Sequence, residues 1–148
     1  MNTTGGGSAA KTFSTCVRHN CPEETRKATE ENIKKAVAAH RAYVKGRSED
    51  YAAKMMAAMD PEKLVKGKNN VAYRGCALKH CGHLVKAMIR DTLAAARKHK
   101  SGEKNPTVRA FLETKFVPKL EALLEQKTVT DAMLRAYASS VYASQAIR

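Results

Sequence analysis

The sequence contains no tryptophan, and aromatic residues make up only 5% of its 148 positions. Alanine supplies much of the apolar content instead, and an alanine side chain buries less apolar area than a leucine or a phenylalanine. We therefore expect a thin hydrophobic core, in which a covalent or metal cross-link brings a large gain in stability. The length is typical of one domain.

Long apolar runs and catalytic motifs are also missing. The first twelve residues are polar and glycine-rich, without the apolar segment of a secretory signal. No uncharged stretch reaches the roughly 18 residues that a membrane span needs. The sequence has no phosphate-binding glycine loop, nucleophile elbow, zinc-protease helix or paired-carboxylate pattern. We predict a chain that is not an enzyme and that does not span a membrane.

Acidic residues are scarce: 14 Asp and Glu stand against 27 Lys and Arg, and the formal net charge is +13. Residues 51–100 hold eleven basic residues and three acidic ones, which leaves +8 (11 − 3) in that third. Such a surface suits an anionic partner, although it also occurs as a solvated face. The candidate residues for an anionic-partner face are Lys66, Lys68, Arg74, Lys79, Lys86, Arg90, Arg97, Lys98 and Lys100.

Helical periodicity covers most of the chain, and no segment alternates with the two-residue period of a strand. The predicted fold class is all-α, with about five to six helices in a helical hairpin or bundle. Helix-start and helix-stop residues place one helix over 22–46 and a short one from Ser48. Asp60-Pro61 then begins a turn of helix that ends at Gly67. The longest predicted helix covers about 71–100, the next begins at Asn105-Pro106 and is kinked at Pro118, and the last follows a capping box at Thr128.

Apolar positions at helical spacing predict the buried faces. In the helix over 22–46 they are Ile33, Val37 and Val44, with Ala36 and His40 beside them. In the longest helix the stripe is Leu78, Cys81, Leu84, Val85, Met88, Ile89, Thr92, Leu93 and Ala96. The uncharged run 136–147 and the cluster Met55, Met56 and Met59 are predicted contact surfaces for a partner.

Composition divides the chain into three parts. Residues 1–11 are predicted to be a flexible N-terminal arm because they are rich in glycine and small polar residues. Residues 12–100 are predicted to form a helical hairpin region that carries the cysteine motifs. Residues 101–148 are predicted to form a C-terminal helical pair.

One short motif occurs twice. Phe13, Cys16 and Cys21 recur as Tyr73, Cys76 and Cys81, each displaced by 60 residues, and these are the only four cysteines. Each copy is therefore an aromatic residue followed by a C-x4-C pair. Because packing alone does not require one offset to recur at every cysteine, the repeat indicates that the four cysteines meet in space.

Three interpretations of the four cysteines remain open. Antiparallel helices would bring Cys16 near Cys81 and Cys21 near Cys76, as two disulfides require. Residues five apart on an ideal helix differ by about 140° around its axis, so this pairing also requires irregular helix near the motifs. Pro22 and Gly82, which directly follow the second cysteine of each pair, are placed to provide it.

The other two interpretations keep the cysteines reduced. Four thiolates can hold zinc tetrahedrally, with His19, His80 and His83 as further candidate ligands, although a spacing of four residues is at the edge of the usual range. Alternatively, the thiols are small, partly buried apolar groups. Zinc is the one cofactor that the sequence leaves open, and otherwise none is predicted.

The paired motifs, Phe13-x-x-Cys16-x4-Cys21 and Tyr73-x-x-Cys76-x4-Cys81, resemble a signature of small helical virion proteins, such as minor capsid proteins, of large nucleocytoplasmic DNA viruses. The resemblance covers about 18 of 148 residues. It implies a structural role in a shell, assembly in the host cytoplasm, and disulfides made there by the virus's own thiol oxidase.

Two functions from different classes follow. The first is a non-catalytic structural component of a large assembly, a minor capsid or virion protein that bridges larger protein subunits. The second is a basic nucleic-acid-binding protein of packaging or chromatin-like type, located in the cytoplasm or nucleus, which would bind phosphates without sequence preference. The single aromatic residue in 66–100, Tyr73, argues against stacking on single strands.

Overall fold

The computed structural model describes residues 7–46 and 51–147, with the side chains of 43–46, 51 and 52 outside the description. Within these ranges the chain is all-α and contains no strand. The helix start predicted at Ser48 lies outside the described residues. Apart from one single-turn helix, and with two bent helices each counted once, the described chain forms six helices, which confirms the predicted fold class.

The first four helices form the first unit: α1 (Gly7–Asn20), α2 (Pro22–Gly46), α3 (Tyr51–Ala58) and the single turn α4 (Pro61–Leu64). The helix over 22–46 has the predicted bounds. Asp60 caps α4 as predicted, since its carboxylate accepts a hydrogen bond of 2.9 Å from the backbone N–H of Glu62. Helix α1 begins earlier than predicted, because residues 7–11 of the expected arm are already helical.

The second unit comprises α5 (Lys68–Cys81), the 3₁₀ turn η1 (Gly82–Leu84), α6 (Val85–Gly102), α7 (Pro106–Phe111), the π-helical turn η2 (Leu112–Phe116) and α8 (Val117–Glu125). The helix predicted over about 71–100 is divided in two at Gly82, where irregular helix was expected for a disulfide pairing. Cys81 leaves the helical region of backbone space, with φ −127° and ψ 9°, and η1 follows it before α6 begins. The disturbance expected at Pro118 takes the form of the π-helical turn just before it.

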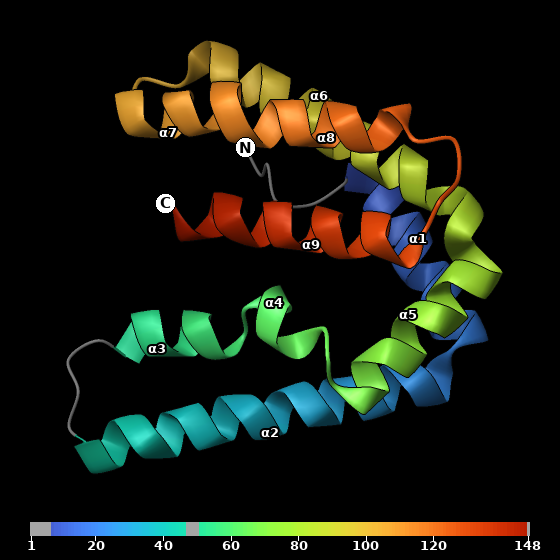
Figure 1. Ribbon diagram of the computed structural model, residues 1–148, viewed down its shortest axis with the longest axis vertical. Helices are drawn as coiled ribbons and strands as arrows, with labels where there is room; N and C mark the ends of the chain where they lie inside the picture. The colour runs from blue at the N-terminus through green and yellow to red at the C-terminus, as the bar shows by residue number, and fades with distance from the viewer. Residues whose placement is uncertain (1–6, 47–50, 148) are drawn as a thin grey trace.

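Helix α9 (Asp131–Ala146) follows the two units. The predicted capping box at Thr128 is wrong by two positions, because Thr130 is the N-cap and its hydroxyl accepts from the N–H of Met133 at 3.1 Å. In Figure 1, α9 lies between α3 and α4, below, and α7 and α8, above. The C-terminal helices thus share the core of the rest of the chain.

The two units are packed reciprocally. Helix α1 contacts α5 and α6, while α5 contacts α1 and α2. Each second helix is then covered by a helix that folds back on it, α3 on α2 and α8 on α6 (Figure 1). Each unit therefore completes the packing of the other.

The 60-residue repeat extends to hydrogen bonds that the sequence did not reveal. Glu31 of α2 accepts from the N–H of Asn69 at 3.1 Å, in the first turn of α5. Asp91 of α6 accepts from the N–H of Ala9 at 3.2 Å, in the first turn of α1. The two donor residues are 60 positions apart in the sequence, and so are the two acceptor residues. Each second helix thus caps the first helix of the other unit with a carboxylate, where the helix dipole favours negative charge.

Glycine precedes both capped turns, again at an offset of 60. Gly7 has a φ of +58°, which side chains disfavour. At Gly67, a Cβ atom would lie 1.8 Å from the Glu31 carboxylate oxygen. The first position thus needs glycine for its backbone conformation, and the second needs it for the approach of the capping carboxylate.

The core lies along α6 and the helices around it. Six residues of α6 are buried, and they are the predicted stripe from Val85 onward: Val85, Met88, Ile89, Thr92, Leu93 and Ala96. Leu78 and Leu84, also predicted in this stripe, are only partly buried. Leu112, Phe116, Leu120 and Leu123 cover α6 from α7–α8, and Met133, Leu134 and Tyr137 come from α9.

The predicted apolar face of α2 is wrong. Ile33 is 55% exposed and Val37 is 41% exposed, and the side chain of Val44 lies outside the description. Among the described side chains of α2, only Ala28 is buried. The helical period was correct, but α3 and α5 pack against other parts of α2.

Candidate functional site

Two disulfides join the units where α1 and α5 lie side by side. Cys16 pairs with Cys81 and Cys21 with Cys76, with Cα–Cα distances of 6.0 and 6.1 Å. This confirms the disulfide interpretation and the pairing expected for antiparallel helices. The described chain contains no free cysteine. A disulfide sulfur is not a thiolate, so the four cysteines do not form a zinc site in this state.

The helix ends explain how two cysteines five residues apart can both face the partner helix. Cys16 and Cys76 lie inside helices, whereas Cys21 lies at the break between α1 and α2, and Cys81 at the break before η1. Each disulfide therefore joins a cysteine within a helix to one at a helix end. The breaks turn the second cysteine of each motif toward the partner helix, as a continuous helix could not.

The nine predicted anionic-partner residues are distributed over α5, the two residues before it, and α6. Three of the nine are engaged in the fold. Arg74 has a side chain that is only 13% exposed, and it donates to Asp131 at 2.7 Å and to the carbonyl of Val65 at 3.0 Å. Arg97 pairs with Glu121 at 2.9 Å. Lys86 donates to the carbonyl of Lys127 at 3.4 Å.

The other six basic residues form no ion pair with a described residue. Lys66 lies just before α5, Lys68 begins it and Lys79 lies near its end, whereas Arg90, Lys98 and Lys100 lie on α6. Lys68 and Lys79 share an exposed stripe of α5 with Val71, Ala72 and Gly75. The structure thus divides the basic residues between two helices and leaves a narrower basic stripe on α5.

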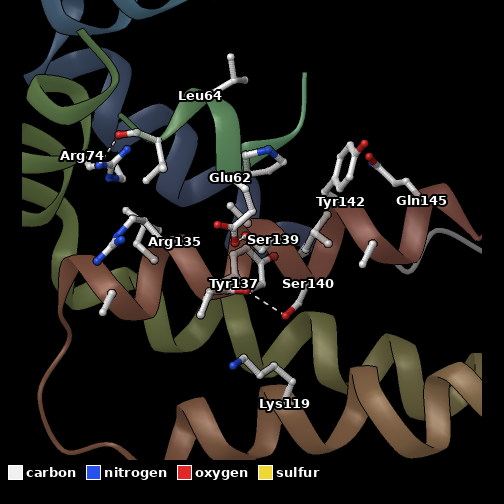
Figure 2. Close-up of a pocket in the computed structure, with 18 of the residues that line it drawn as sticks. Glu62, Leu64, Arg74, Lys119, Arg135, Tyr137, Ser139, Ser140, Tyr142 and Gln145 are labelled. Atoms are coloured by element: carbon white, nitrogen blue, oxygen red, sulfur yellow. Dashed lines mark hydrogen bonds between the residues drawn. The ribbon is translucent and has the colours of Figure 1, made fainter. Parts of the chain in front are cut away.

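A cleft of about 980 Å³ follows α9. One side is formed by the chain from Met59 to Val65, and the other by residues of α7–α8 from Phe111 to Lys119. Phe13, Met88 and Tyr137 also line it. Figure 2 shows Lys119 extending from α8 toward α9, with Glu62 of α4 on the opposite side of α9.

Hydrogen bonds hold the first unit against α9 along this cleft. The Ser139 hydroxyl donates to the Glu62 carboxylate at 3.0 Å, and the Tyr142 hydroxyl donates to the carbonyl of Met56 at 2.7 Å. Asp131 accepts from both Arg74 and Arg135, at 2.7 and 2.9 Å. These bonds occupy most of the charged groups in the cleft.

The cleft floor contains a buried polar pair. The hydroxyls of Tyr137 and Thr92 lie 2.7 Å apart, and the Thr92 hydroxyl also donates to the carbonyl of Met88 at 3.1 Å. Burial raises the pKa of Tyr137 above its ordinary value, because the phenolate would lose hydration there. The phenol is therefore a neutral structural group at physiological pH.

The sequence indicated parts of this cleft but not its shape. Met59 and the uncharged run 136–147 were predicted contact surfaces, and Met59 and α9 do line the cleft. Leu134 and Tyr137, however, are buried in the core, so α9 is partly a core helix. The remaining wall comes from residues that are distant in sequence, for which no local signal existed.

Three further findings concern metal binding, membrane spans and similarity to known proteins. Within residues 7–46 and 51–147, no group of three or more His, Cys, Asp or Glu side chains is placed to hold a metal ion. None of the described helices is long and apolar enough to cross a membrane. Neither a protein-family model, nor a curated protein, nor a solved structure matches this chain.

Proposed function

We propose that this chain is a non-catalytic structural component of a large assembly, of the minor capsid or virion type, which bridges larger protein subunits. The observation that carries the proposal is a cross-linked frame that leaves large apolar side chains exposed on its outer helices. Two disulfides hold α1 against α5, while Ile33 and Val37 on α2 and Val71 on α5 are 55%, 41% and 51% exposed. Such side chains, on a frame that cannot rearrange to bury them, favour burial by another protein.

A bridging role also fits the position of the disulfides in the fold. The disulfides join the two units at one end, and the α2–α3 pair extends away from them (Figure 1). Removing apolar area from water in an interface yields roughly 25 cal/mol per Å² before the costs of association. The described fold of α2, with one buried residue, leaves that area available.

Incorporation of a tagged chain into particles from its own source cells tests the proposal. Density-gradient fractions should show the parent chain with the particle. The double variant Ile33→Asp/Val37→Asp should fold with the same helix content and both disulfides, yet remain in the light fractions. Glu24→Gln/Lys27→Gln, on the same helix, serves as the control and should be incorporated. A parent chain that is found only as a free monomer would contradict the proposal.

Nucleic-acid binding remains a second proposal, supported by the exposed α5 stripe in which Lys68 and Lys79 flank the small residues Ala72 and Gly75. Small residues allow close approach of a helix to a phosphate backbone. Duplex affinity measured against salt concentration tests it: several phosphate contacts give a log–log slope of several units. Lys68→Gln/Lys79→Gln should lower that slope by about two. Loss of all binding at physiological salt would leave these residues as solvated charge.

A further inference from the structure

We propose that the cleft beside α9 receives about two turns of an amphipathic helix from a partner subunit, with acidic residues that pair with Lys115 and Lys119. This inference rests on the proposed structural function, since it names where and by what chemistry a partner binds. The volume, the lining and the charge of the cleft each favour a partner helix as its occupant.

The volume of the cleft suits a helix. A helix with side chains is about 10 Å across and rises 5.4 Å per turn, so each turn occupies on the order of 400 Å³. A cleft of about 980 Å³ therefore accommodates about two turns. Its walls, from α4, α7–α8 and α9, are themselves helices, against which another helix packs by the same ridges and grooves.

The lining is mostly apolar. Its apolar side chains that are only partly buried include Leu64, Val65, Phe111 and Val141. Met59, which is 36% exposed, has a flexible thioether that adapts to the shape of a partner. One face of an occupant must therefore be apolar, which a helix provides with residues spaced three and four apart.

The charged side chains of the cleft predict the charge on the other face of the occupant. Arg74 and Arg135 are neutralised by Asp131, and Glu62 is bonded to Ser139. Lys115 and Lys119 are exposed and form no ion pair with any described residue. They lie four positions apart, on one side of the cleft, and so match two carboxylates at the same helical spacing.

A second copy of the chain is disfavoured as the occupant by its charge. Two copies at +13 each repel one another, and the free charges of the cleft are also positive. A partner helix with glutamates at positions i and i+4 removes this repulsion. The unpaired lysines thus specify both the sign of the partner and its register.

Fluorescence anisotropy with labelled peptides tests the inference on the intact, oxidised protein. The probes are two designed helical peptides of about 14 residues with the same apolar face. One carries Glu at two exposed positions four apart, beside that face, and the other carries Lys there. The Glu peptide should bind, and the Lys peptide should bind at least about tenfold more weakly.

Charge reversal locates the binding site. Lys115→Glu/Lys119→Glu should weaken the Glu peptide by at least about tenfold and improve the Lys peptide. The control Lys79→Glu/Lys98→Glu makes the same change in net charge outside the cleft and should have a much smaller effect. Ala138→Trp, which fills the cleft beside α9 without changing charge, should weaken both peptides.

Four outcomes would overturn the inference. They are equal effects of the two charge-reversal variants, no effect of Ala138→Trp, no binding of the Glu peptide at millimolar concentration, and displacement of the bound peptide by oleate or by a second copy of the chain. Particle incorporation separates this from the function itself. If Lys115→Glu/Lys119→Glu is incorporated normally, the cleft is not the docking site although the structural role stands.

Discussion

The two units of this chain begin alike and end differently. Both contain a helix with an inner cysteine, a break at the second cysteine, and a longer helix that caps the other unit with a carboxylate. Yet α6 buries six residues and α2 buries one among its described side chains. At the 60-residue offset, buried Leu93 corresponds to Ile33, which is 55% exposed. The same local design therefore gave a core in one unit and a surface in the other.

The difference arises from what lies over each second helix. Helix α6 is enclosed by α1, η2 and α8, and the Thr92–Tyr137 hydrogen bond ties it to α9. Helix α2 is covered by α3 and α5, and it has no comparable apolar cover over Ile33 and Val37. We infer that the second unit provides most of the stability and that the first provides surface.

The disulfides should give the largest effect, because they are what the two units share. Replacing all four cysteines with alanine removes both bridges, and a loop with a sequence separation of 55 is alone worth about 4 kcal/mol in the chain-entropy model. Removing Cys16 and Cys81 while the other bridge remains should cost less, about 3 kcal/mol, because the remaining bridge already shortens the loop. Urea denaturation measures both. An unfolding midpoint equal to that of the parent would rule out a stabilising cross-link.

Truncation of corresponding residues tests the difference between the units directly. Leu93→Ala should lower the free energy of unfolding by about 2–5 kcal/mol, because it removes a buried side chain. Ile33→Ala should cost less than about 0.5 kcal/mol, because its side chain is mostly in water. Chemical denaturation of both variants at low protein concentration makes the comparison. Similar costs would mean that α2 is covered in the isolated protein.

Glycine substitutions separate the capped turn from ordinary helix. Gly67→Ala places a Cβ atom against the Glu31 carboxylate, and losing that cap should cost about 1 kcal/mol. Gly75→Ala is the matched control in the same helix, since its Cβ meets nothing within 4 Å. It should raise stability by up to about 1 kcal/mol through helix propensity. Thermal denaturation of both variants shows whether each substitution raises or lowers stability. A stabilising Gly67→Ala would contradict the role of Glu31 as a cap.

A residue of the second unit can be introduced at the corresponding position of the first unit. The hydroxyl of Thr25 is buried and finds no hydrogen-bond partner among the described residues, whereas the corresponding residue of the second unit is Val85. Thr25→Val should therefore stabilise the protein by about 1 kcal/mol, because it removes an unsatisfied polar group at nearly constant volume. Thr29→Val is the control, since the Thr29 hydroxyl donates to the backbone carbonyl of Thr25 at 2.8 Å. It should bring no such gain in a urea titration.

The smallest effect concerns pH. The hydrogen bond from Asn70, followed by that from the Asn69 backbone, holds the pKa of Glu31 below its ordinary value. A lowered pKa means that the stabilisation is present above the unfolded-state pKa, near 4.3, and is lost as pH falls through the folded-state pKa. The stability difference between the parent and Glu31→Gln should thus be constant near neutral pH and shrink in acid. In an Asn70→Ala background this pH dependence should largely disappear, and an undiminished one would contradict the assigned cause.

The predictable parts of the fold are those governed by neighbours in the chain. Asp60 and Asn105 each bond a backbone N–H two residues away, so their helix starts were readable from sequence. The cysteine pairing was predictable because one offset relates both motifs. The basic residues could be identified, but Arg74 could not be recognised as structural, since Asp131 is 57 positions away.

The cleft was only partly predictable for the same reason. Met59 and the uncharged run of α9 stood out in the sequence, whereas Lys115 and Lys119 did not. Their availability depends on which acidic residues the fold places near other cations: Arg109 takes Glu113 and Arg97 takes Glu121. The Arg109–Glu113 pair spans only four positions of the chain, but the Arg97–Glu121 pair is known only after the helices have packed.

Sequence by itself determined the helical class, most helix starts and stops, the net charge and the meeting of the four cysteines, because these follow from contacts within a few residues, from composition or from the repeated motif. Tertiary structure alone decided that the cysteines form disulfides, the reciprocal carboxylate caps, the exposure of Ile33 and Val37, and the cleft beside α9. A helix with a weak apolar stripe, such as α2, has no strongly preferred face. Which side enters the core is then settled by the helices that pack upon it, and those lie far away in the chain.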